Sequence, residues 1–257
     1  MKEYEIEERR GIFYGFFPAF KERKIWAVTS FRKGGVSFGR YATLNTGYFT
    51  DDWDVNIIIN RRRFCSIHNI RFTRVVTLKQ VHGKRIITPD KPAEDDLRSI
   101  IPRKKGDGFI LSSKIPVAVF TADCVPLFLF ETEQRIKGLL HIGWRGLYAG
   151  IIEEFFKKLL KMGGAPDKLI VGIGPSIRDC CYEVQPDFKK FFNEKFFKKR
   201  NGRLFFSLQK VIIDKLVSGG VKSENIFDSK ICTYCEEELC YSYRRDGKTG
   251  RMMSIIF

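Results

Sequence analysis

Short apolar runs, each closed by turn or charged residues, recur along most of the chain. Runs of this length are typical of buried β-strands and are too short for helices. The pattern therefore predicts strands at residues 25–31, 74–79, 108–111, 116–121, 125–130, 136–141, 169–173 and 252–257.

A different spacing begins after Gly146. Apolar residues then recur every three or four positions as far as Gly163 and Gly164, which predicts an amphipathic helix. Two more helices are expected, one from Pro186 and one from about Ser207. Asp51 and Asp52 are suitable N-terminal caps for a further helix, which carries Val55, Ile58, Ile59, Arg62 and Ile67.

Strands interspersed with helices predict a mixed α/β (α+β) fold, with a mixed sheet and flanking helices. Residues 88–105 are polar, contain three prolines and are expected to form a loop. The chain has no internal repeat and no linker rich in Pro, Gly or Ser. We therefore expect a single domain over residues 1–257, with residues 1–24 as an N-terminal extension.

The composition of the chain bears on the cellular compartment of the protein. Hydrophobic residues make up 44% of the 257 residues, which is enough to bury a core. No apolar run approaches the roughly 20 residues that span a bilayer, and the N-terminus lacks an apolar signal stretch. Seven cysteines, with Cys180 and Cys181 adjacent, indicate reduced thiols. These features predict a cytoplasmic protein.

The net charge of +16 indicates anionic partners or a charge-rich surface. Phosphate-bearing substrates need only a local arginine cluster, whereas nucleic acid needs a continuous basic stripe. Lysines and phenylalanines alternate in the segment that follows Asp187. The Phe spacing of three and four there predicts an amphipathic helix that faces the core, so we interpret its lysines as a solvated basic face and expect no nucleic acid partner.

Three segments place a metal-ligand type beside a tight turn. They supply His82, Cys124 and His141, and the chain has only three histidines. Two imidazoles and one thiolate suit zinc or copper, and three protein ligands leave a fourth position open. The alternative is a buried core thiol with two histidines that serve their turns. Spacing alone does not decide whether the three side chains meet.

The segment that contains His141 has a second feature. Gly143 and Gly146 permit close backbone approach, and Arg145 offers a forked donor just before the expected helix. This combination suits a phosphate or carboxylate, unless Arg145 only ties the loop down. Arg32, Arg40 and Asn45, in or beside the first Gly-rich turn, are candidates for anion or ribose contacts, or they belong to a plain surface loop.

Cys232 and Cys235 form a Cys-x-x-Cys pair, and Cys240 follows a few residues later. This spacing invites a structural zinc site, but no fourth ligand is obvious. The alternative is a buried turn with reduced thiols.

Ten motifs, in one order from residue 25 to the C-terminus, resemble a known family. They begin at Gly34, Leu44, Asn60, Gln80, Gly106, Thr121, His141, Gly172, Cys180 and Ser242, and the most specific are Gln-Val-His-Gly, Thr-Ala-Asp-Cys and His-Ile-Gly-Trp-Arg-Gly. The chain resembles the laccase-domain family, also called the polyphenol oxidase or purine nucleoside phosphorylase family and formerly the multicopper polyphenol oxidoreductases.

The resemblance implies one α/β domain with a zinc ion held by His82, Cys124 and His141. It also implies phosphorolysis of adenosine, inosine and methylthioadenosine to base and ribose-1-phosphate, and deamination of adenosine to inosine. Purine nucleosides and phosphate would be the partners. The three ligands and Asp123, as a proton shuttle, would be catalytic. Substrate contacts would come from Asn45, Arg61, Gln80, Arg145 and Arg244.

Three other functions remain open. A copper phenol oxidase matches the older family name, but three histidines are too few for a trinuclear copper centre. A cysteine hydrolase would use Cys124 as nucleophile and His82 or His141 as base. A binding or scaffold protein would show salt-sensitive nucleic acid binding and no turnover. The sequence predicts no particular oligomeric state.

Overall fold

The apolar runs form two six-stranded sheets that are stacked face to face. The computed structural model describes residues 3–93 and 101–257. Its first sheet has the order β1-β2-β3-β15-β7-β4 and is antiparallel except for the pair of β4 and β7. Its strands are β1 (Glu5–Arg9), β2 (Ile12–Phe16), β3 (Ala27–Ser30), β4 (Val76–Thr77), β7 (Val117–Thr121) and β15 (Met252–Ile256).

The second sheet has the order β14-β10-β8-β9-β6-β5. The pairs of β10 with β14 and of β5 with β6 are parallel, and the others are antiparallel. Its strands are β5 (Ile86–Ile87), β6 (Gly108–Leu111), β8 (Val125–Glu131), β9 (Lys137–Ile142), β10 (Leu169–Ile173) and β14 (Ile226–Asp228).

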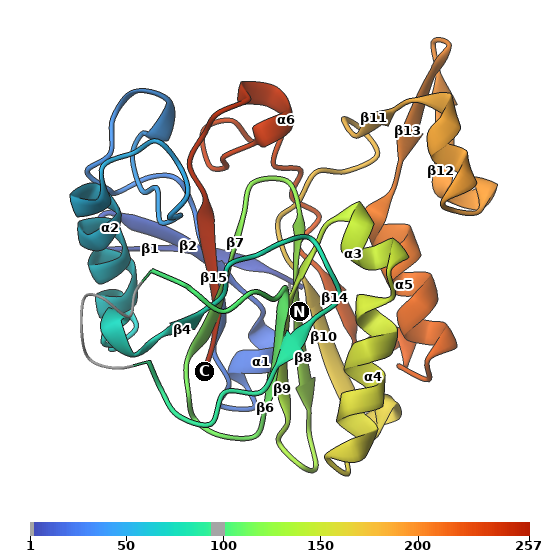
Figure 1. Ribbon diagram of the computed structural model, residues 1–257, viewed down its shortest axis with the longest axis horizontal. Helices are drawn as coiled ribbons and strands as arrows, with labels where there is room; N and C mark the ends of the chain where they lie inside the picture. The colour runs from blue at the N-terminus through green and yellow to red at the C-terminus, as the bar shows by residue number, and fades with distance from the viewer. Residues whose placement is uncertain (1–2, 94–100) are drawn as a thin grey trace.

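Helices cover the outer faces of both sheets (Figure 1). The side chains of α2 pack on the first sheet, and those of α3, α4 and α5 pack on the second. The helices are α1 (Pro18–Lys21), α2 (Asp54–Ile67), α3 (Trp144–Tyr148), α4 (Ile151–Lys161), α5 (Leu208–Ser218) and α6 (Tyr243–Asp246). Short 3-10 turns are η1 (Gly39–Tyr41), η2 (Phe72–Arg74), η4 (Pro166–Lys168), η5 (Pro186–Lys190), η6 (Glu194–Phe196) and η7 (Ser223–Asn225). No helix in these described ranges is long and apolar enough to cross a bilayer.

The strand β8 shows why the central runs read as continuously apolar. Its odd-numbered residues, such as Leu127 and Leu129, pack under α4 and α5. Its even-numbered residues Phe128 and Phe130 pack between the two sheets. Since both faces are buried, no polar alternation appears in the sequence. The mixed α/β fold is thus confirmed, as are the strands expected around residues 25–31, 108–121, 125–141, 169–173 and 252–257.

The helix expected after Gly146 is confirmed but divided. Gly150, with φ +89°, separates α3 from α4. The helix expected at Ser207 is also confirmed, because the Ser207 hydroxyl accepts the Lys210 amide and caps α5. The strand expected at residues 74–79 is shorter, since η2 occupies its start.

Two expectations about the N-terminal part of the chain are corrected. Neither Asp51 nor Asp52 caps α2: Trp53 is the N-cap residue and provides no side-chain cap. Asp51 instead pairs with Lys248 at 2.7 Å. Residues 5–21, expected as an extension, form β1, β2 and α1. Because β2 pairs with β3, this segment is an integral part of the first sheet.

The helix expected from Pro186 does not form. The segment contains η5 and η6, then a small sheet of order β11-β13-β12 with β11 (Glu183–Val184), β12 (Phe197–Arg200) and β13 (Arg203–Phe206). Asn201 and Gly202 both have positive φ, as in the two-residue turns that join hairpin strands. The phenylalanines still pack on the core, and Lys189, Lys190, Lys195 and Lys198 pair with carboxylates.

Two connections between the sheets meet at one edge. The turn from β7 to β8 contains Cys124, and the connection from β4 to β5 contains His82. Strand β9 brings His141 to the same edge. Part of the loop expected at residues 88–105 lies outside the described residues.

Candidate metal centre and cavity

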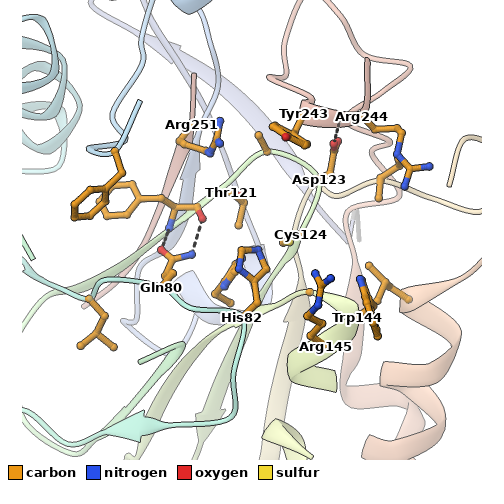
Figure 2. A pocket seen from close by; sticks show the side chains of 18 of the residues that line it. Gln80, His82, Thr121, Asp123, Cys124, Trp144, Arg145, Tyr243, Arg244 and Arg251 are labelled. Carbon is orange, nitrogen blue, oxygen red and sulfur yellow. Dashed lines mark hydrogen bonds between the residues drawn. The ribbon is translucent and has the colours of Figure 1, made fainter. Parts of the chain in front are cut away.

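His82, Cys124 and His141 converge on one point. Their candidate ligand atoms all lie within 4.8 Å of one another, and the two imidazole rings are 4.8 Å apart at 75°. Ligand atoms around a tetrahedral zinc ion are roughly 3.3–3.8 Å apart, so the three side chains are within reach of one ion. Figure 2 shows His82 and Cys124 in the middle of the cavity.

Asp107 holds two of these three ligands in place. Its fully buried carboxylate accepts the Nδ1 hydrogen of His141 at 2.9 Å, which leaves Nε2 of that ring for a metal. The same carboxylate accepts the backbone amides of His82 and Gly83, both at 2.8 Å. His82 itself has φ +58°. Asp107 therefore fixes both a histidine tautomer and the turn that presents the other histidine.

The charges of the ligands depend on one another. Burial opposes ionisation of Cys124, yet the neighbouring His141 and His82 lower its pKa to about 6. Burial also opposes protonation of His141, but Cys124 and Asp107 raise its pKa to about 9. Both shifts favour a thiolate on Cys124 and a proton on His141 in the metal-free pair. The thiolate is the form that binds zinc or copper, and a metal would displace the proton from His141.

Gly143 and Gly146 allow the chain to pass close to the ligands, as expected from the sequence. A Cβ atom on Gly143 would lie 3.0 Å from His82 Cδ2 and 3.1 Å from Cys124 Sγ. A Cβ atom on Gly146 would lie 2.7 Å from the carbonyl oxygen of Gly83. Side chains at either position would therefore push the ligand loops apart.

We expect Gly143→Ala to weaken metal binding on the order of tenfold, because its methyl group would displace His82 or Cys124. The matched control is Gly83→Ala, where the added Cβ would have only ordinary contacts of 3.6 and 3.8 Å. Competition with a chromophoric chelator measures both affinities. Equal affinities in the two variants would contradict this account.

The metal-ligand candidates lie in the wall of a cavity of about 660 Å³. This volume is in the range of small-molecule sites. Six aromatic side chains also line it: Tyr48, Phe49, Phe120, Trp144, Tyr182 and Tyr243. Phe49 and Tyr243 are 62% and 60% exposed, so their rings are accessible to a planar ligand. A flat, apolar ligand with an anionic part would match this lining.

Four arginines line the cavity, and they differ in their partners. Arg145 stacks on Trp144 at 4.5 Å and has no hydrogen-bond partner among the described residues. Arg244 donates to the Glu183 carbonyl, and Arg251 donates to nearby carbonyls of its own loop. Arg61 is buried between Tyr48 and Phe120 and donates to the Thr46 carbonyl. Arg145 is thus the cation best placed for an anionic ligand (Figure 2).

Other predicted site residues have structural partners. Gln80 lines the cavity, but both ends of its amide bond the backbone of Phe120 at 2.8 Å. Asn45 is fully buried outside the lining, and its amide holds Asp52 and Arg251. Arg32 and Arg40 are likewise absent from the lining.

Asp123 adjoins Cys124 in the cavity wall. Its two carboxylate oxygens accept the Thr233 hydroxyl and the Arg244 amide, both at 2.6 Å. With φ +99°, it occupies a conformation that is rare for a residue with a side chain. These two bonds fix the carboxylate at the edge of the cavity, next to the metal-ligand candidates.

Sequence reasoning missed several residues of the site. Asp107 stands between two glycines at the start of a buried strand, and a carboxylate in so apolar a context is a usable signal. Phe49 lies far along the chain from Tyr243 and Arg251. The fold alone brings them to the cavity.

Known proteins resemble this chain in sequence. A purine nucleoside phosphorylase of Aquifex aeolicus is 37% identical over 189 residues, which cover 71% of this chain and 88% of that protein. The purine nucleoside phosphorylase YlmD of Bacillus subtilis is 30% identical over 246 residues, which cover 91% and 88% of the two chains.

Solved structures agree. YlmD from Geobacillus stearothermophilus has a TM-score of 0.90 and 30% identity, and the match covers 100% of this chain and 98% of that one. A hypothetical protein YfiH of Bacillus licheniformis has a TM-score of 0.89 at 28% identity, with 98% of both chains covered. The sequence model of the multi-copper polyphenol oxidoreductase laccases matches residues 26–257, and this chain belongs to that family.

Proposed function

We propose that this protein is a zinc-dependent purine nucleoside phosphorylase that also deaminates adenosine. Its substrates would be adenosine, inosine and methylthioadenosine, with phosphate as the second substrate. The observation that carries the proposal is the convergence of His82, Cys124 and His141 beside an aromatic cavity. That cavity also contains Arg145, which has no hydrogen-bond partner within the described part of the chain. Relatives named purine nucleoside phosphorylases support the substrate class.

The residues present fit a zinc ion. Asp107 leaves the Nε2 atom of His141 for a metal, Cys124 favours the thiolate, and Gly143 has no side chain to obstruct the ligands. An ion bound there by three protein ligands would keep a fourth position open and supply a local positive charge and Lewis acidity.

In phosphorolysis, a phosphate oxygen attacks C1′ of the ribose, the bond from C1′ to the base breaks, and the base leaves with the bonding electrons and needs a proton. The Arg145 guanidinium would bind and orient the phosphate through its forked donors. The rings of Phe49 and Tyr243 would stack on the purine. Asp123, fixed at the cavity edge by Thr233 and Arg244, is our candidate for carrying the proton.

The other predicted substrate contacts would act in two ways. Arg244 and Arg61 line the cavity and would contact the nucleoside through their guanidinium groups. Gln80 and Asn45 would instead hold the cavity-lining segments in place, because their amides are hydrogen-bonded to backbone and to neighbouring side chains.

Arg145→Ala is expected to raise the KM for phosphate about 10- to 100-fold, since a hydrogen bond to a charged group contributes about 1.5–3 kcal/mol. Arg145→Lys should recover part of this loss, because it retains the charge but not the fork. Steady-state kinetics at varied phosphate concentration measure the effect. Deamination of adenosine needs no phosphate and serves as the internal control. Equal losses in both reactions would contradict a phosphate-specific role.

The test of the proposed function is product analysis on the purified, zinc-loaded protein. With adenosine and phosphate we expect adenine, ribose-1-phosphate and inosine. Without phosphate we expect inosine alone. Adenine formed equally without phosphate would indicate a hydrolase, and no product in either case would refute the proposal.

A second candidate is a cysteine hydrolase. Cys124, His141 and Asp107 are linked in the order of a nucleophile, a base and an orienting carboxylate, and the pKa of Cys124 is lowered. Alkylation separates the candidates: protection of Cys124 by zinc favours the metal enzyme, and rapid alkylation in the zinc-loaded protein favours the hydrolase. A copper oxidase would instead show copper on metal analysis and turnover of phenols.

A further inference from the structure

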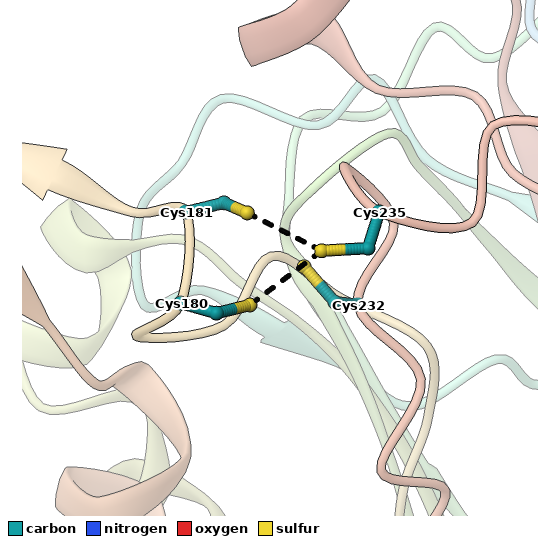
Figure 3. Close-up of side chains that lie close together, drawn as sticks. All are labelled: Cys180, Cys181, Cys232 and Cys235. Atoms are coloured by element: carbon teal, nitrogen blue, oxygen red, sulfur yellow. Dashed lines mark hydrogen bonds between the residues drawn. The ribbon is translucent and has the colours of Figure 1, made fainter.

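A second group of metal-ligand side chains lies outside the site described above. Cys180 and Cys181 come from the segment between β10 and β11, and Cys232 and Cys235 come from the segment between β14 and α6. All four sulfur atoms lie within 4.8 Å of one another (Figure 3). Cys240, which the sequence grouped with this pair, is buried elsewhere and is not one of the four.

The distances fit one ion. The Cys235 sulfur is 3.4 Å from that of Cys181 and 3.8 Å from that of Cys180. A zinc–sulfur bond of about 2.3 Å gives a tetrahedron with edges of about 3.8 Å. The two sulfur–sulfur distances are thus close to the edge length of a zinc tetrahedron. A disulfide would bring together only two of the four sulfurs.

Hydrogen-bond donors lie next to part of this cysteine group. The backbone amides of Cys235, Arg178 and Tyr234 donate to the Cys232 sulfur. The guanidinium of Arg200 bonds the carbonyl oxygens of Asp179 and Cys180, at 3.0 and 2.7 Å. Amides and cations around a tetrathiolate group offset its excess negative charge.

We infer that Cys180, Cys181, Cys232 and Cys235 bind one zinc ion in a closed, structural tetrathiolate site. Four protein thiolates leave no open position, so this ion would not take part in catalysis. The proposal is independent of the function assigned to the first site. It adds a second metal ion per chain and a ligand set that shares no residue with His82, Cys124 and His141.

The site would join two segments that build the cavity wall. Tyr182, next to Cys181, lines the cavity. Thr233, between Cys232 and Cys235, donates its hydroxyl to Asp123. One ion that binds both segments would therefore fix the positions of Tyr182 and Asp123 relative to each other. Loss of the ion should lower the thermal unfolding temperature as well as the zinc content.

The experiment is elemental analysis of zinc in dialysed protein that was purified with a thiol reductant. We expect two zinc ions per chain in the parent, one in His82→Ala, one in the double variant Cys232→Ser/Cys235→Ser, and none when all three substitutions are combined. Cys240→Ala is the matched cysteine control and should retain two. One ion in both the parent and the double variant, or none in His82→Ala, would overturn the proposal.

A second measurement does not depend on the folding of the cysteine variants. In His82→Ala, a mercurial that modifies thiols should release the remaining zinc ion. Cobalt substituted into the same protein should give the intense thiolate charge-transfer absorption of a tetrahedral tetrathiolate ion. Disulfides would instead leave these cysteines unreactive before reduction, and that result would contradict the inferred site.

Discussion

His82→Ala is expected to remove one zinc ion per chain and to abolish both phosphorolysis and deamination. Loss of a partner of a metal ligand typically lowers affinity 10- to 100-fold, so loss of the ligand itself should cost on the order of 100-fold or more. His82 is the most informative of the three ligands because its side chain is exposed, whereas His141 is buried against Asp107. The His82 variant should therefore fold normally.

Zinc analysis and product analysis on the same preparation measure this effect. Lys84→Ala provides the control, since Lys84 is an exposed residue in the same loop and is not a metal-ligand type. The control should retain the metal and both activities. If the His82 variant kept full activity after losing its zinc ion, the metal would have no catalytic role.

Asp107→Asn is expected to lower zinc affinity at the first site about 10- to 100-fold, with a parallel loss of activity at limiting zinc. One carboxylate oxygen accepts from His82 and His141, and the other accepts from Gly83. Whichever oxygen becomes an amide nitrogen, it meets a donor. If that nitrogen faces His141, the ring must move its hydrogen to Nε2 and can no longer bind the ion through that atom.

Zinc titration against a competing chelator measures the change, and excess zinc should restore most of the activity. Asp167→Asn removes the same charge from an exposed turn and should leave the affinity unchanged. If excess zinc failed to restore activity while the variant stayed folded and metal-loaded, Asp107 would act on the reaction by a route other than ligand orientation.

The sequence predicted the central strands well for a physical reason. Strand β8 is buried on both faces, so its apolar run is unbroken and easy to detect. The helix predicted after Pro186 is wrong because phenylalanines spaced by three and four also suit irregular chain that packs on a core. The dipeptide Asn201-Gly202 was also present there. An Asn-Gly pair predicts a hairpin turn more strongly than the Phe spacing predicts a helix.

Ligand types and turns were visible in the sequence at His82, Cys124 and His141, but their convergence was not. It depends on two connections that pass between the sheets. The cysteine group was missed for the same reason: Cys180 and Cys235 are 55 residues apart, and only the packing of two loops brings them together. Local spacing instead suggested Cys240, which points into the core.

The most direct test of the central claim is a comparison of products from the parent and His82→Ala, each incubated with adenosine in the presence and absence of phosphate. We predict adenine and ribose-1-phosphate from the parent only with phosphate, inosine from the parent in both cases, and no product from the variant. Product formation by the variant at the rate of the parent, or no turnover by zinc-loaded parent protein, would contradict the assignment.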